Sequence, residues 1–247
     1  MVPIVAAAAL AGACWGVVLP GLVDRYAVEW PEGVPRPPWR TACDRCGADR
    51  PRWWRSSGGC PACGWRRGPG RWITVPLSAL AWTVVTAAVG PSAALLAFLL
   101  LAALALPLAL IDLRVLRLPD PLLGTAFFGG AVLLAIAAVT TGQADRLLRA
   151  GYAALACGIV YLVVALVPRS QLGFGDVKLG AVLGLYLGWS GWFAVGAAVV
   201  LAPLVNLPLI IGLLVTHRAG RKTSVPYGPA MFGAAMVALV LAALRQA

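Results

Sequence analysis

The chain has 247 residues, of which 61% are hydrophobic and 12% are charged, and its formal net charge is +11 at pH 7. A water-soluble domain carries about 25% charged residues, so this composition excludes an ordinary soluble protein and indicates a membrane protein. The positive charge needs no nucleic-acid partner, because the basic residues gather in loops between apolar segments. We therefore expect lipids, and no nucleic acid, around the chain.

Eight apolar runs follow one another along the chain, and most are long enough to cross a bilayer as helices, for which about 20 residues are needed. They cover approximately residues 2–21, 72–90, 92–111, 121–141, 150–168, 178–190, 192–215 and 228–244. The sequence therefore predicts an all-α polytopic membrane protein with about eight transmembrane helices.

The segment 22–71 is the one long polar stretch, and it contains two Cys-x2-Cys pairs separated by 13 residues. Four thiolates at such spacing are typical of a structural Zn²⁺ site with no open position. A metal would also stabilise a loop that has few aliphatic residues. Two disulfides are the alternative, which a reducing cytosol disfavours. We predict a small zinc-ribbon-like domain with these ligands: Cys43, Cys46, Cys60 and Cys63.

These patterns divide the chain into three expected parts: a first transmembrane helix (1–21), a zinc-binding loop (22–71) and a seven-helix membrane domain (72–247). Of the 20 Lys and Arg residues, 17 fall in the loops after the first, third, fifth and seventh runs. Basic loops stay on the cytoplasmic side and attract anionic lipids. We therefore expect the 22–71 loop in the cytoplasm and both termini outside it.

Only three of the nine acidic residues are predicted to adjoin apolar helices, namely Asp112, Asp120 and Asp176. Asp24, like the other acids of the 22–71 segment, is assigned to the loop. An ionisable group at membrane depth costs roughly 2.5–3.5 kcal/mol and is a functional candidate by default. The predicted topology places the three acids at the cytoplasmic ends of their helices.

Asp112 ends the third predicted helix and Asp176 opens the sixth, so the two carboxyl groups can meet. Neighbouring carboxyl groups share a proton and titrate as a pair, which is the aspartic-protease arrangement for activating water and protonating a leaving amine. Gly173 and Gly175 would let a backbone approach Asp176.

Two residues beside this pair have simpler interpretations. Asp120 is interpreted as a helix N-cap behind Pro119. Lys178 either stabilises the charged form of Asp176 or anchors the helix end at the lipid headgroups.

Four motifs occur in the order found in one protein family. Residues 173–176, Gly-Phe-Gly-Asp, are similar to the Gly-x-Gly-Asp motif of the bacterial type IV prepilin peptidases, which are intramembrane aspartic proteases. Residues 112–120 resemble the family's Asp-x6-Pro-Asp stretch, and residues 226–229 resemble its Pro-Phe-Gly-Pro segment. The paired cysteines between the first two helices also match. The resemblance covers nearly the whole chain.

The resemblance implies that Asp112 and Asp176 are catalytic and that the substrate is a prepilin or pseudopilin helix, whose basic leader is removed at the cytoplasmic face of the bacterial inner membrane. Many members also methylate the new N-terminus with S-adenosylmethionine. The residues expected to support the active site are Gly173, Gly175, Lys178, Asp120, Pro226, Gly228 and Pro229.

The chain departs from the family in the segment associated with methylation, because the cysteine spacer is short and the entry to the second helix, Gly70-Arg71-Trp72, lacks the Tyr-Pro-x-x-Glu-like pattern. No Gly-rich dinucleotide fingerprint is present either. Two other functions stay open: a proton-coupled carrier that uses the buried acids, and a zinc-ribbon scaffold. No inverted repeat favours the carrier, and the scaffold leaves the acids unexplained.

Overall fold

The structure is a computed structural model that describes residues 1–29, 39–50, 59–66, 68–167, 172–215 and 226–246. Within these ranges the chain is helical, and its extended pairing is limited to two isolated bridges. Both bridges lie between the first two helices, in the segment 27–70 that contains the four cysteines and that we call the cysteine loop. The predicted all-α class is confirmed.

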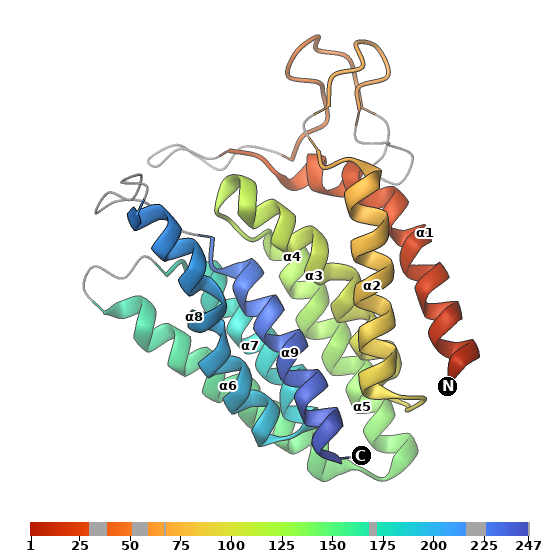
Figure 1. The fold of residues 1–247 in the computed structure, drawn as a ribbon, viewed down its shortest axis with the longest axis vertical. Helices are drawn as coiled ribbons and strands as arrows, with labels where there is room; N and C mark the ends of the chain where they lie inside the picture. The colour runs from red at the N-terminus through yellow and green to blue at the C-terminus, as the bar shows by residue number, and fades with distance from the viewer. Residues whose placement is uncertain (30–38, 51–58, 67, 168–171, 216–225, 247) are drawn as a thin grey trace.

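The helices of the described residues form eight rods that lie side by side (Figure 1). One rod is continuous through three segments, α4, the π-helical η2 and α5. The bounds are α1 Val2–Tyr26, α2 Arg71–Val89, α3 Leu95–Val115, α4 Asp120–Gly124, η2 Thr125–Gly129, α5 Gly130–Thr141, α6 Ala144–Leu166, α7 Phe174–Ser190, α8 Trp192–Val215 and α9 Gly228–Gln246.

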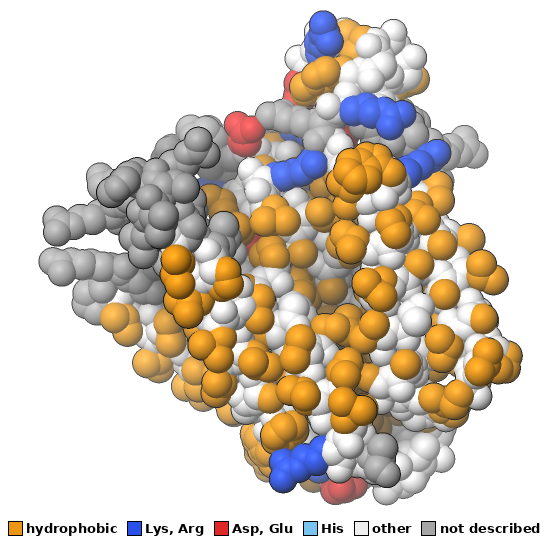
Figure 2. All heavy atoms as spheres, in the orientation of Figure 1, with side chains coloured by type: hydrophobic (Ala, Val, Ile, Leu, Met, Phe, Trp, Pro, Cys, Tyr) orange, Lys and Arg blue, Asp and Glu red, His pale blue; other side chains and the backbone are white. Residues whose placement is uncertain are grey.

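The rods have the length and surface of membrane helices. Six of them are long and apolar enough to cross a bilayer, and α8 contributes the shorter apolar stretch Trp192–Pro208. Large apolar side chains are exposed along the body of the bundle, for example Leu10, Val139 and Leu155. In Figure 2 hydrophobic side chains cover this body, while Lys, Arg, Asp and Glu lie at its two ends. The chain is a multi-pass membrane protein.

Small residues bring α6 and α7 together. A Cβ on Gly184 would lie 2.5 Å from the carbonyl oxygen of Ala153, so only glycine permits this approach. Arg149 of α6 also donates to the carbonyl oxygens of Gly188 and Trp189 at the end of α7, at 2.8 and 2.9 Å. Close packing of small residues is a common way for membrane helices to associate, and here it fixes the position of α7.

The helix α1 extends five residues beyond the predicted run and ends at Tyr26. Asp24 therefore lies in the last turn of a membrane helix and is buried, so its assignment to the polar loop was wrong. The sequence pattern failed there because a lone acid normally ends an apolar run, whereas this carboxylate is neutralised by two arginines from the loop. Both chain termini lie at the opposite end of the bundle from the cysteine loop (Figure 1).

Candidate active site and metal centre

Asp112 lies in the last turn of α3 and is 4% exposed. The helix ends at Leu116, which adopts the left-handed conformation (φ 51°, ψ 38°) and donates its N–H to the carbonyl oxygen of Asp112 at 2.9 Å. This conformation is uncommon for a residue other than glycine. It turns the chain across the end of the bundle toward α4.

The first residue of α9 holds the Asp112 carboxylate, since the backbone N–H of Gly228 donates to Oδ2 at 2.9 Å. The first N–H groups of a helix have no partner within the helix, and the helix N-terminus favours negative charge. A Cβ on Gly228 would lie 2.8 Å from Oδ2, so a side chain would obstruct this bond. Pro226 and Pro229 flank this residue, and Pro229 is the second residue of α9.

Asp176 is the third residue of α7, and its Oδ2 accepts the N–H of Gly173, the N-cap residue, at 3.2 Å. This is one half of a capping box. Gly173 is extended (φ −78°, ψ 154°), so its backbone conformation does not require glycine. Gly175 has a packing role, because a Cβ there would lie 3.3 Å from Cβ of Leu118.

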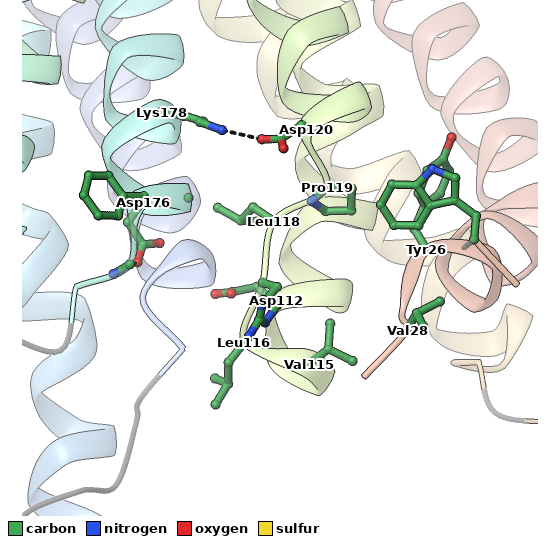
Figure 3. A pocket seen from close by; sticks show the side chains of 15 residues that line it. Tyr26, Val28, Asp112, Val115, Leu116, Leu118, Pro119, Asp120, Asp176 and Lys178 are labelled. Atoms are coloured by element: carbon green, nitrogen blue, oxygen red, sulfur yellow. Dashed lines mark hydrogen bonds and ion pairs between the residues drawn. The ribbon is translucent and has the colours of Figure 1, made fainter. Parts of the chain in front are cut away.

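One cavity of about 360 Å³ contains both acids (Figure 3). The two carboxylates point toward this shared space, and the charge of Asp176 acts on Asp112. Each has one oxygen bound by a backbone N–H, and among the described residues the other oxygen has no donor. The structure therefore brings the two predicted acids together with free acceptor capacity for water or substrate.

The predicted N-cap role of Asp120 is wrong, because Pro119 occupies the N-cap position of α4 and Asp120 is the first residue of the helix. Its Oδ1 instead lies 2.5 Å from Nζ of Lys178, and both side chains are more than half exposed. The partner of Lys178 is thus Asp120. The sequence analysis had considered only Asp176 or the lipid headgroups as partners of this lysine. The ion pair joins α4 to α7 at the edge of the cavity (Figure 3).

Four aromatic residues lie near the acids, and three of them, Tyr26, Trp39 and Tyr161, were not predicted from the sequence. Tyr26 and Trp39 line the cavity and meet edge to face, with ring centroids 4.8 Å apart. Tyr161 and Tyr227 form a second such pair at 6.4 Å. Burial and the charge of Asp176 raise the pKa of Tyr227. Tyr227 belongs to the segment 226–229 that the sequence had already indicated, whereas no local pattern distinguishes Trp39.

The four cysteines of the loop converge as predicted, with all Sγ atoms within 4.8 Å of one another. Two pairs of sulfurs, Cys43 with Cys63 and Cys46 with Cys60, lie 3.8 and 3.5 Å apart. Tetrahedral Zn–S bonds of about 2.3 Å place sulfurs roughly 3.8 Å apart. The cluster could hold a metal ion such as zinc, and its four cysteines are free of disulfides.

The backbone of each Cys-x2-Cys turn also favours a bound cation. The N–H groups of Arg45 and Cys46 point at the sulfur of Cys43 and lower its pKa to about 6. The pKa of Cys60 is lowered in the same way by the N–H groups of Cys63 and Ala62. Thiolate is the form that binds metals, so these turns prepare two of the ligands.

A glycine with positive φ follows each cysteine pair, Gly47 at 71° and Gly64 at 70°. This conformation, which glycine adopts at no steric cost, turns the chain back so that antiparallel bridges form between Ala42 and Asp49 and between Gly59 and Arg66. The repeated Cys-Gly pair was a sequence signal that the spacing argument overlooked.

Comparison with protein families finds a similarity in the part of the chain that contains the two acids. Residues 98–207 match the model of the type IV leader peptidase family, a range that includes Asp112 and Asp176 and excludes the cysteine loop. The chain is thus a multi-pass membrane protein with two acids at one cavity.

Several curated proteins, each named prepilin leader peptidase/N-methyltransferase, are similar to the chain. The protein of Aeromonas hydrophila is 30% identical over 187 residues, which cover 71% of this chain and 63% of that protein. The protein of Dickeya chrysanthemi is 34% identical over 153 residues, or 61% and 52% of the two chains. The chain spans between about half and two thirds of the length of these relatives. No solved structure shows a significant match.

Proposed function

We propose that the chain is a membrane-embedded aspartic endopeptidase that removes the basic leader from type IV prepilins or pseudopilins. The observation that carries this proposal is the meeting of Asp112 and Asp176, from two helices, at one cavity. Both acids lie within the matched residues 98–207. The names of the similar proteins support the substrate class. The catalytic roles of the two acids are part of the proposal.

In this mechanism the two carboxyl groups share one proton, because two neighbouring charges repel. The ionised member accepts a proton from water, whose oxygen bonds to the carbonyl carbon of the scissile peptide. The protonated member gives its proton to the leaving nitrogen as the C–N bond breaks. The bonds from Gly228 to Asp112 and from Gly173 to Asp176 hold both groups in place for this exchange.

We place the reaction at the cytoplasmic face of the bacterial inner membrane. Asp112 and Asp176 lie at helix ends, where water is available, and not in the middle of a bilayer. The cysteine loop extends from the same end of the bundle (Figure 1), and the loops expected at this end carry most of the basic residues. Basic loops favour the cytoplasmic side.

A gel-shift cleavage assay tests this function with purified protein in detergent and a model prepilin that has a Gly-Phe junction. We expect a shortened product from the wild type and from Asp145→Asn, an exposed acid remote from the cavity. Asp112→Asn and Asp176→Asn should give none. Cleavage that survives both substitutions would exclude the pair. If folded wild type cleaves no prepilin, proton-coupled transport becomes the function to measure.

We also propose that the four-cysteine loop binds one structural Zn²⁺. The converging sulfurs and the N–H groups aimed at Cys43 support this assignment, and four cysteines leave no open position for chemistry on the metal. Elemental analysis should find about one zinc per chain. Cys60→Ser should lower the zinc content, whereas Cys14→Ser, outside the cluster, should not. Equal zinc in both variants would refute the site.

The names of the relatives also include N-methyltransferase, which suggests a second activity. We carry it to this chain as a candidate that mass spectrometry decides. The cleaved product is incubated with enzyme and S-adenosylmethionine, and a gain of about one methyl group at its N-terminus supports the activity. An unchanged mass beside complete cleavage restricts the chain to the peptidase reaction.

A further inference from the structure

The buried acid Asp24 has no part in the proposed chemistry, yet its carboxylate is paired with two arginines. It is 2% exposed, in the last turn of α1. Its Oδ1 lies 3.4 Å from Nη1 of Arg40, and its Oδ2 pairs with Nη1 of Arg50. Both arginines are themselves nearly buried and belong to the cysteine loop.

The same contacts fix the backbone where the loop leaves α1. Arg40 donates to the carbonyl oxygen of Asp24 at 2.9 Å and to that of Ala27 at 3.2 Å. Its own N–H donates to the carbonyl oxygen of Arg25 at 3.2 Å, and the N–H of Arg50 donates to that of Thr41 at 2.8 Å. These interactions, which we call the Asp24 clasp, attach the cysteine loop to the end of α1.

Trp39, the residue directly before Arg40, lines the cavity that contains Asp112 and Asp176. Its ring packs edge to face against Tyr26 of α1, and Val28 and Val115 continue the same apolar wall. In Figure 3 Tyr26 and Val28 lie on the far side of Asp112 from Asp176. One wall of the cavity is thus supplied by a segment that the clasp holds, whereas the acids come from α3 and α7.

We propose that Asp24 is a positioning residue for substrate binding. Through Arg40 and Arg50 it holds the loop so that Trp39 and Tyr26 form an apolar subsite, which takes the apolar side chain directly after the cut bond. This inference rests on the proposed peptidase function. An aromatic wall a short distance from the polar reacting groups is the usual composition of a site that orients an apolar ligand.

The test compares model prepilins that carry Phe or Ala directly after the cut. Wild type should prefer Phe through a lower KM. Trp39→Ala should raise KM for the Phe substrate about tenfold, as expected for a lost apolar contact, with kcat and the KM for the Ala substrate nearly unchanged. Trp39→Phe should restore most of the preference. Asp145→Asn is the control.

Asp24→Asn should reproduce the loss of preference, and the double variant with Trp39→Ala should lose little more, because both changes act on one subsite. Thermal unfolding checks that each variant is folded. If Asp24→Asn does not fold, Trp39→Ala still decides the subsite, since Trp39 makes none of the clasp's ion pairs.

The failures of the two proposals are distinguishable. Wild-type cleavage with an undiminished Phe preference in Trp39→Ala overturns the subsite and leaves the peptidase intact. A fall in kcat alone in Asp24→Asn overturns the positioning role. Absence of cleavage by wild type overturns the proposed function itself.

Discussion

Asp24 and Asp112 are both buried in the last turn of a membrane helix, but their surroundings differ. Two guanidinium groups neutralise Asp24. Asp112 has one backbone N–H and the charge of a second acid, Asp176, instead of a cation. A carboxylate that is fully paired holds structure together, whereas one that faces another acid keeps a proton to exchange. Burial alone therefore does not distinguish a candidate catalytic acid from an acid that is neutralised by neighbouring cations.

The largest expected effect follows from removing either member of the proposed pair. Asp112→Asn or Asp176→Asn should lower cleavage by about 10²–10⁴-fold, the range for loss of a general acid or base. Stability should change little, because the amide oxygen of Asn can accept the same backbone N–H bond that the carboxylate accepts. The assay is prepilin cleavage, with thermal unfolding measured beside it. Equal losses of cleavage and of folded protein would make Asp112 structural, like Asp24.

Asp24→Asn should instead lower the stability of the protein strongly. Removal of one partner from a buried ion pair costs about 3–5 kcal/mol, since Arg40 and Arg50 stay buried with less compensation. Denaturant unfolding in detergent measures the loss. Asp44→Asn is the matched control, because Asp44 pairs with the same Arg40 but is 40% exposed, and it should cost at most about 1 kcal/mol. Equal losses would contradict the special role of Asp24.

Gly228→Ala tests whether the backbone N–H of Gly228 positions the Asp112 carboxylate. The added Cβ would lie 2.8 Å from Oδ2 of Asp112 and displace the carboxylate, and a displacement of about 1 Å can reduce the rate about 100-fold. Gly233→Ala on the same helix is the control, because its Cβ would lie 3.7 Å from its nearest neighbour, Val205. A rate equal to that of the control would show that the N–H of Gly228 does not position Asp112.

The smallest effect should come from the exposed pair of Lys178 and Asp120. Lys178→Met should lower the free energy of unfolding by about 0–1 kcal/mol, as for other solvent-exposed ion pairs. The difference should shrink further in about 1 M salt, which screens such charges. Unfolding at low and high salt measures it. A salt-independent loss as large as that of Asp24→Asn would place this pair in a low-dielectric environment.

Much of this architecture could be predicted from the sequence, because the signals are local. A run of apolar residues forms a helix in a bilayer whatever its neighbours are, so the eight rods and the ends at Asp112 and Asp176 were foreseen. The four cysteines were foreseen too, since each Cys-x2-Cys turn is complete within a few residues.

The long-range partners could not be predicted in this way. Gly228 and Asp112 are 116 positions apart, and Lys178 and Asp120 are 58 apart. The local sequence around each of these residues does not indicate its partner on another helix. The burial of Asp24 was missed for the same reason, because its arginines follow 16 and 26 residues later.

The membrane class, the helices and the two cysteine turns thus follow from the sequence, because all of them depend on local hydrophobicity and spacing. The packing of the helices determines which buried acid is neutralised and which pair of acids faces a cavity. Those properties depend on charges and N–H groups carried by other helices, and their distances arise only when the helices pack.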